Sequence, residues 1–264
     1  MQSSRADGRA GASVLRDRMS MTSAPTSADI DAAMAKSAGE AFLLMRAWAE
    51  AGVAEAQAIL GQLLLDGRGA PVDPEAAFGW FSKAAAAGHP MGLNMAGRCL
   101  ENGIGVSPDP VKSTALYAKS ARAGLAWGMY NYATSLALGR GVEEDREAAF
   151  AWLSKAVEMG HAKSMAILGG FYEDGWVVEK NDAQARALYE ASARAGDFRG
   201  HFNFARFLVR ENNIPEATDH LNAAYGGGTP AFRDKMLTFL RQSGHHALQG
   251  AAARLEFSAG GRRA

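Results

Sequence analysis

The chain has 264 residues, of which 48% are hydrophobic and 21% are charged. These proportions are typical of folded proteins and exclude a disordered chain. Lys plus Arg number 28 and Asp plus Glu number 28, so the net charge is zero. A neutral chain argues against non-specific binding to nucleic acid or to an anionic membrane, because both need a basic excess. The single cysteine, Cys99, excludes an internal disulfide framework and a cysteine-rich metal site.

Targeting signals are not visible in the sequence. No apolar run approaches the ~18 residues that a membrane helix requires, and the first residues contain no apolar stretch of secretory length. We therefore expect a cytoplasmic protein with no membrane insertion. Residues 1–28 are polar and rich in Ser, Ala and Arg, so we expect a disordered tail, with Met19 and Met21 as alternative starts.

Glycines repeat at a period of 36 residues through most of the chain. One series is Gly52, Gly88, Gly124, Gly160 and Gly196; a second is Gly67, Gly103, Gly139 and Gly175. A third series is Gly69, Gly105 and Gly141, and it is interrupted at Val177. A fixed period of this length indicates an array of stacked structural repeats.

Each repeat is predicted to be a helix, a loop and a second helix. Apolar and small residues at Ala56, Leu60, Gly61 and Leu64 share one face of a first helix over Ala54–Asp66, which ends at Gly67. The second helices follow helix-capping residues at a constant spacing. These residues are Ser37, Asp73, Asp109, Asp145 and Asn181.

The repeats are predicted to stack into an all-α, right-handed superhelical solenoid. One helix pair leaves an apolar side bare, and its neighbours supply the missing contact surface. We expect a capping half-repeat at 29–52, five repeats at 53–88, 89–124, 125–160, 161–196 and 197–230, a closing helix pair at 231–257, and a frayed tail at 258–264.

The repeat pattern resembles a known family. Ala56-x3-Leu60-Gly61-x2-Leu64-x2-Gly67, followed by Asp73-x3-Ala77-x2-Trp80-x3-Ala84-Ala85-x2-Gly88, is similar to the Sel1-like repeat, a relative of the tetratricopeptide repeat. The resemblance implies a bacterial-style adaptor that holds other proteins. It also implies that the first helix of each repeat lines the concave side of the solenoid.

Residues with catalytic or metal-binding chemistry are scattered. His89 and His161 lie two repeats apart in one register, and adjacent His245 and His246 point to different faces of a helix start. We interpret these histidines as capping or helix-start residues and Cys99 as a small buried thiol. No nucleophile, base and orienting group can be named together, so we expect no catalytic residue, no cofactor and no metal.

A partner-binding surface is predicted on the first-helix face that the repeat core leaves over, which carries positions 55, 58, 59, 62 and 66. Aromatic rings supply contact area, Asn amides bind an extended backbone and Arg meets carboxylates. The candidates are Asn94, Arg98, Trp127, Tyr130, Asn131, Thr134, Arg199, Phe202, Asn203 and Arg206. The alternative is that Trp127, Tyr130 and Phe202 pack against neighbouring helices.

Three functions follow from this sequence. The first is a non-enzymatic scaffold that binds a peptide or protein partner in its concave face. The second, implied by the resemblance, is a hydrolase acting on envelope or antibiotic substrates. The third is a self-assembling structural protein, since exposed apolar faces at an uncapped end could pair chains. We expect the first, with the protein a monomer or weakly self-associating.

Overall fold

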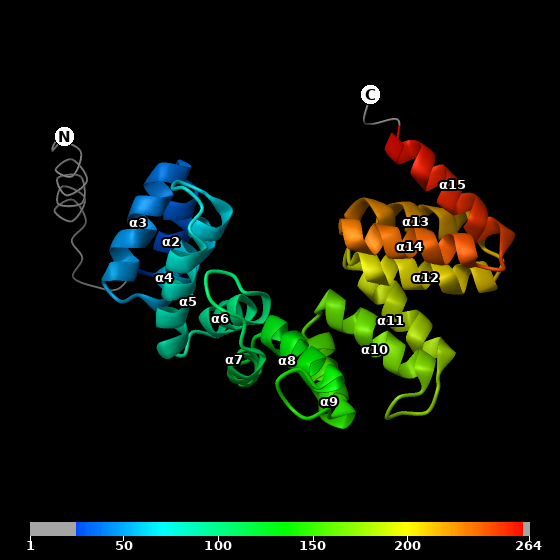
Figure 1. Cartoon of the computed structure of the whole chain (residues 1–264), viewed down its shortest axis with the longest axis horizontal. Helices are drawn as coiled ribbons and strands as arrows, with labels where there is room; N and C mark the ends of the chain where they lie inside the picture. Colours follow the sequence, from blue (N-terminus) through cyan, green and yellow to red (C-terminus); the bar gives the residue numbers. More distant parts are fainter. Residues whose placement is uncertain (1–24, 261–264) are drawn as a thin grey trace. The chain divides into compact units, whose positions relative to one another are not determined.

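The computed structural model describes residues 25–260, with side chains described through residue 256. Within this range the chain forms fourteen helices and no strand (Figure 1). The helices are α2 (Ser27–Met34), α3 (Ala38–Glu50), α4 (Ala54–Asp66), α5 (Pro74–Ala86), α6 (Pro90–Asn102), α7 (Pro110–Arg122), α8 (Ala126–Leu138), α9 (Arg146–Glu158), α10 (Ala162–Asp174), α11 (Asp182–Arg194), α12 (Phe198–Arg210), α13 (Ile214–Gly227), α14 (Pro230–Gln242) and α15 (His246–Gly260).

The helices belong to two compact units, one ending at Glu144 and the other beginning at Asp145. Unit 1 contains α2 to α8, and unit 2 contains α9 to α15. Within each unit most helices pack on the next helix in the chain, and the first helices of successive repeats also contact one another, as in α4–α6, α6–α8 and α10–α12. This consecutive packing confirms the all-α solenoid class.

Local sequence signals set the helix boundaries. The first helix α4 ends at Gly67, whose φ of 67° is left-handed and favours glycine over residues with a Cβ. The second helix α5 begins after Asp73, whose carboxylate accepts a hydrogen bond from the Ala76 N–H at 2.9 Å. Pro74 then occupies the first turn, where its missing N–H costs no helical hydrogen bond.

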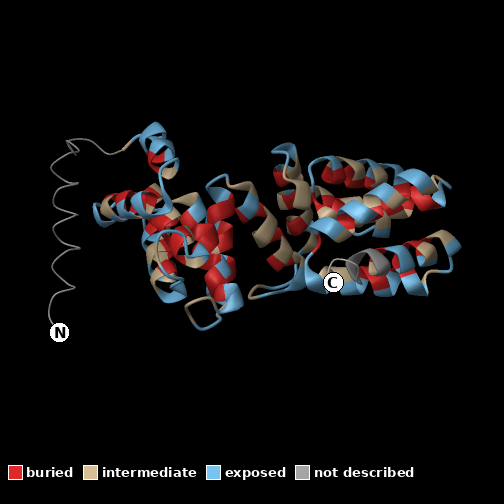
Figure 2. Cartoon of the chain, turned by 90° about the horizontal axis from the view of Figure 1, so that it is seen from above, coloured by how far each residue is buried: buried red, intermediate tan, exposed pale blue. Residues whose placement is uncertain are grey.

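Small residues let the two kinds of helix approach closely. A Cβ added at Gly128 on α8 would lie 2.3 Å from Ser120 Oγ on α7, and one at Gly200 on α12 would lie 2.4 Å from Ser192 Oγ on α11. Larger apolar side chains fill the remaining interior. Figure 2 colours the buried positions along the helices red. Among the largest of these, Phe81 and Met45 are fully buried in unit 1, and Leu208 is 1% exposed in unit 2.

Both described ends differ from the predicted boundaries. α2 begins at Ser27, because Thr26 Oγ1 accepts the Asp29 N–H at 3.3 Å and the Asp29 carboxylate accepts the Thr26 N–H at 2.8 Å. The predicted tail through residue 28 was therefore too long, and its residues 1–24 lie outside the described part. α15 continues to Gly260, beyond the predicted end at residue 257, and residues 261–264 also lie outside the described range.

The loop between the two helices of the fifth predicted repeat is shorter than in the earlier repeats, and an asparagine takes its left-handed position. Only residues 211–213 separate α12 from α13, and Asn212 adopts a φ of 60° there. Asparagine tolerates the left-handed region better than most residues with a Cβ. The following helix α13 extends through Gly227, so it includes two glycines of the run at 226–228.

Candidate partner-binding surface

The predicted binding residues are distributed over both units. Those of unit 1 lie on the first helices α6 and α8, and those of unit 2 lie on α12. Because all three helices are first helices of their repeats, the candidates occupy equivalent positions within the two units.

Asn94 is more deeply buried than the repeat pattern predicted. Its side chain is 2% exposed, and its Oδ1 accepts a hydrogen bond from Asn131 Nδ2 at 2.8 Å. The neighbouring first helix covers this register, since Ala58 and Ala166 at the equivalent positions are also buried. The expected surface position of Asn94 was wrong, and its amide joins α6 to α8.

The remaining candidates of unit 1 lie nearer to solvent. Trp127 is 40% exposed and contacts the Tyr130 ring edge-to-face at a centroid distance of 6.2 Å. Thr134 Oγ1 donates to the Tyr130 carbonyl at 2.8 Å. Arg98 is exposed, with Nη1 3.4 Å from Met95 Sδ. One ring and one guanidinium are therefore accessible on the first helices of this unit.

An apolar cavity of about 370 Å³ opens between α4 and α6 of unit 1. It lies on the predicted first-helix face. Its lining residues are Glu55, Ala58, Ile59, Gln62, His89, Met91 and Met95. The sequence interpretation did not select the two methionines, although Met91 lies one period before Trp127 and Met95 one period before Asn131.

The histidine at the cavity edge is a helix cap. His89 Nδ1 accepts the Gly92 N–H at 3.2 Å at the start of α6, and His161 Nδ1 similarly accepts the Ser164 N–H at 3.3 Å. Burial lowers the pKa of both imidazoles, which favours the neutral ring that capping requires. The predicted capping role is confirmed for these two residues.

Cys99 does not have the properties of a nucleophile. It is fully buried on α6, and burial raises the pKa of its thiol to about 11. A thiol that stays protonated at neutral pH is a poor nucleophile, because the thiolate is the reactive form. The interpretation of Cys99 as a small buried thiol is confirmed.

The aromatic candidate of unit 2 packs against other helices. Phe202 contacts Phe232 and Phe239 on α14, edge-to-face at centroid distances of 5.7 and 5.4 Å. It also borders the buried core of the unit. Packing, the alternative that the sequence left open, therefore describes Phe202 better than exposure does. In the first turn of the same helix, the Arg199 guanidinium stacks 4.6 Å from the centroid of the Phe198 ring.

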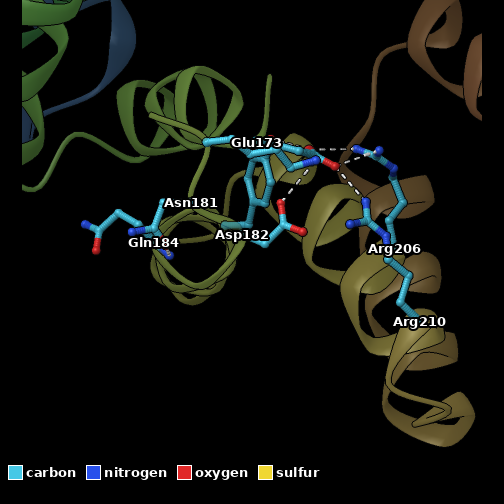
Figure 3. Close-up of polar contacts among 8 residues, drawn as sticks. Glu173, Asn181, Asp182, Gln184, Arg206 and Arg210 are labelled. Carbon is cyan, nitrogen blue, oxygen red and sulfur yellow. Dashed lines mark hydrogen bonds and ion pairs between the residues drawn. The ribbon is translucent and has the colours of Figure 1, made fainter. Parts of the chain in front are cut away.

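Arg206 is held by a carboxylate that the sequence interpretation missed. Its Nη2 is 3.0 Å from Glu173 Oε1 and its Nη1 is 3.3 Å from Glu173 Oε2, and Asn203 Oδ1 accepts from the same Nη1 at 3.3 Å. Arg210 Nη2 donates to Glu173 Oε1 at 2.6 Å. Figure 3 shows both arginines of α12 directed at Glu173 on α10.

A tyrosine completes the Glu173 cluster. Tyr189 Oη donates to Glu173 Oε2 at 2.9 Å, and Tyr117 Oη donates to Glu101 Oε2 at 2.8 Å in unit 1. Burial raises the pKa of both phenols, so both remain donors at neutral pH. The sequence signal was available, because each pair is 16 residues apart and the two pairs are 72 residues apart, which is two periods.

The repeats themselves match a known family over more than half of the chain. The Sel1 repeat matches residues 54–89, 90–125, 128–161 and 162–197. The chain belongs to the Sel1 repeat family. Sel1 repeats generally form protein-interaction scaffolds, and Sel1 repeat proteins are typically non-enzymatic.

Solved structures share the fold of this Sel1 repeat protein. A Sel1 repeat protein from Oxalobacter formigenes superposes with a TM-score of 0.70 at 24% identity, over 87% of this chain and 95% of the other. The protective antigen c5321 of uropathogenic Escherichia coli has a TM-score of 0.62 at 21% identity, over 86% of this chain and 50% of the other. The immunity protein Pa5087 of Pseudomonas aeruginosa has a TM-score of 0.53 at 19% identity, over 77% and 78%. No curated protein matches the sequence.

Neither a metal cluster nor a membrane span is found in the described part of this Sel1 repeat protein. Among the residues that the structure describes, no three His, Cys, Asp or Glu side chains gather in a way that could hold a metal ion. Over the same residues, every helix is too short or too polar to span a membrane.

Proposed function

We propose that this Sel1 repeat protein is a non-enzymatic scaffold that binds a peptide or protein partner on the first-helix face of unit 1. We define this surface, the groove face, by the cavity residues Met91 and Met95 together with Arg98, Trp127 and Asn131. The observation that carries the proposal is the apolar cavity of about 370 Å³ between α4 and α6. It lies on the same helix face as the 40% exposed ring of Trp127.

The composition of the groove face supports partner binding. Methionine, aromatic and arginine side chains are enriched at protein interfaces, and buried aromatic and arginine anchors dominate their binding energy. Methionine is flexible and polarisable, so it adapts to different apolar side chains. The contacts between α4, α6 and α8 support an inner position for the first helices, because successive second helices contact one another less.

The nature of the partner is a separate question from the fold. The related solved structures include one described as an immunity protein and one described as a protective antigen. One architecture thus serves more than one biological role. Our proposal includes a bacterial origin, as for these neighbours, and a cytoplasmic location.

Affinity capture from the native host tests the proposal. The tagged protein is compared with Met91→Asp and Trp127→Ala, and with the control Val111→Asp on the second helix α7. Val111 is 64% exposed and Met91 is 37% exposed, so both substitutions place a carboxylate at a partly exposed apolar position. We expect the two groove-face variants to lose the same partner and the control to retain it. Equal capture by all four proteins would refute the groove face.

A further inference from the structure

The two Glu–Tyr pairs are equivalent in construction. In both, the glutamate lies near the C-terminal end of a first helix and accepts a hydrogen bond from a tyrosine on the following second helix. The phenol fixes one oxygen of the carboxylate, so the carboxylate is oriented before any cation approaches. The two pairs differ in the cationic groups that contact the glutamate carboxylate in addition to the phenol.

In unit 2 the carboxylate binds guanidinium groups of its own chain. Arg206 forms two N–O contacts with Glu173, and Arg210 adds a third. These contacts leave the Glu173 side chain 12% exposed. Bidentate pairing of this type is the geometry that arginine and carboxylate groups favour. Unit 2 therefore shows which ligand the Glu–Tyr construction accepts.

In unit 1 the equivalent arginines are missing. Two periods earlier, the positions of Arg206 and Arg210 hold Thr134 and Leu138. The Glu101 side chain is 33% exposed, and a cavity of about 410 Å³ opens beside it. Residues lining this cavity include Glu101, Ser113, Thr114, Ser135 and Arg140.

The cation nearest to Glu101 makes only a loose contact. Arg140 Nη1 is 3.7 Å from Glu101 Oε1, which is longer than the 3.0 and 2.6 Å contacts of Glu173. The Arg140 side chain is 59% exposed, and exposed ion pairs of this kind contribute little. An incoming guanidinium can therefore replace it at the carboxylate.

We propose that the Glu101 cavity, lined also by the hydroxyl-bearing Ser113 and Ser135, binds the guanidinium group of an arginine side chain from the partner. The inference rests on the proposed function, since the partner peptide presents the arginine. It assigns a second, polar site on unit 1, at the other end of α6 from the apolar cavity. Arginine suits the site better than lysine, because its planar fork matches a carboxylate bidentately.

Nuclear magnetic resonance of the isotope-labelled full chain tests the site. The probes are Nα-acetyl-L-arginine amide and its neutral analogue Nα-acetyl-L-citrulline amide. We expect saturable shifts at the Glu101 carboxylate and the Gly141 amide with the arginine compound, and binding about tenfold weaker with citrulline, because charge-assisted hydrogen bonds are lost. Equal binding of both compounds, or shifts that do not saturate, would overturn the proposal.

Variants separate this site from general surface effects. Glu101→Gln should abolish the shifts, whereas Glu143→Gln, the same change at an exposed residue of the neighbouring loop, should leave them unchanged. Thr134→Arg combined with Leu138→Arg rebuilds the arginine arrangement of unit 2 and should weaken probe binding while raising the melting temperature. Wild-type probe affinity in Glu101→Gln contradicts the site even if the rebuilt variant is misfolded.

The outcome is distinguishable from failure of the proposed function. If Met91→Asp loses its partner but the arginine compound leaves Glu101 unshifted, the groove face stands and the arginine site is wrong. If the compound binds through Glu101 while capture is unaffected by Met91→Asp and Trp127→Ala, the arginine site stands and the groove face is wrong.

Discussion

Asn131 on α8 donates a 2.8 Å hydrogen bond to the buried amide oxygen of Asn94 on α6. The two residues are 37 positions apart, so this bond joins the first helices of successive repeats. Solenoid stability depends on such nearest-neighbour contacts in addition to the stability of each repeat. The Asn94–Asn131 bond therefore helps to hold together α6 and α8, the helices that carry most of the surface that we assign to partner binding.

We predict that Asn131→Ala destabilises unit 1 by about 1–3 kcal/mol, because it leaves the buried Asn94 oxygen without its donor. The control is Asn102→Ala, which removes an exposed amide that donates to the Arg98 carbonyl at 2.9 Å, and it should change stability by about 0.5 kcal/mol or less. Urea unfolding followed by circular dichroism measures both. Equal effects of the two substitutions would show that the Asn94–Asn131 bond has no special contribution.

The sequence predicted the local structure well and the contacts between repeats poorly. Helix boundaries such as Gly67 and Asp73 depend on backbone geometry and capping within a few residues, so a single sequence reveals them. The burial of Asn94 depends on how closely the neighbouring first helix approaches, which helical periodicity does not specify. Phe202 is covered by α14, a helix outside the regular repeat.

The Glu–Tyr pairs of the candidate site show the same difference between local structure, which the sequence predicts, and contacts between helices, which it does not. Glu101 and Tyr117 lie on different helices, and the positions one period away from each are apolar: Leu65 and Ala137 for Glu101, Phe81 and Leu153 for Tyr117. The recurrence of the two residue types at Glu173 and Tyr189 is what marks them as a pair. Whether the glutamate of a pair is open to a ligand depends on the residues of the first helix in the following repeat. The period could have revealed the pairs, but only the structure reveals the cavity.

Val177→Gly should stabilise unit 2. Val177 has a φ of 67°, where the earlier repeats place glycine, and it is 44% exposed. The left-handed conformation costs a residue with a Cβ about 1–2 kcal/mol, whereas glycine costs about 0.5–1 kcal/mol in unfolded-state entropy. We expect a net gain of about 0.5–1 kcal/mol in the free energy of unfolding.

The control for this substitution is Val72→Gly. Val72 is 61% exposed and is not among the described residues with positive φ, so glycine relieves no strain there. It should lower the free energy of unfolding by about 0.5–1 kcal/mol. Thermal unfolding of both variants measures the difference, and a loss of stability in Val177→Gly would contradict the strain argument.

We predict that Glu173→Gln destabilises unit 2 by about 1–3 kcal/mol, because two arginines lose their charged acceptor. Burial alone would raise the pKa of Glu173, but hydrogen bonds and charge from Arg210 and Arg206 lower it below its ordinary value. The stability from this carboxylate is therefore present above the unfolded pKa and is lost in acid as the pH falls through the lower folded pKa. Urea unfolding across the acid range should show a weaker acid dependence in the variant.

Glu211→Gln is the matched control for the Glu173 prediction. Glu211 accepts from Arg186 at 2.8 Å, but its side chain is 45% exposed. Exposed ion pairs contribute about 0–1 kcal/mol, so this variant should lose less stability than Glu173→Gln. An equal loss of stability in the two variants would mean that burial of the Glu173 cluster contributes nothing to the free energy of unfolding.

Unit 2 should also lose stability as the pH falls below neutrality, because of a histidine pair. His201 Nδ1 lies 2.8 Å from His220 Nδ1, an arrangement in which one neutral ring donates and the other accepts. Burial lowers the pKa of His201, and the electrostatic effect of the neighbouring His220 lowers it further, while Asp197 opposes this change. The unfolded chain, with an ordinary histidine pKa of 6.5, then binds its proton first.

The stability from His201 is complete above that unfolded value and declines as the pH falls from 6.5 toward the lower folded pKa. Denaturant unfolding at a series of pH values between about 7.5 and about 5 measures the decline. His201→Gln should flatten it without removing it, because the pKa of His161 in the same unit is also lowered. An unchanged slope in His201→Gln would show that the pKa of His201 does not change on folding.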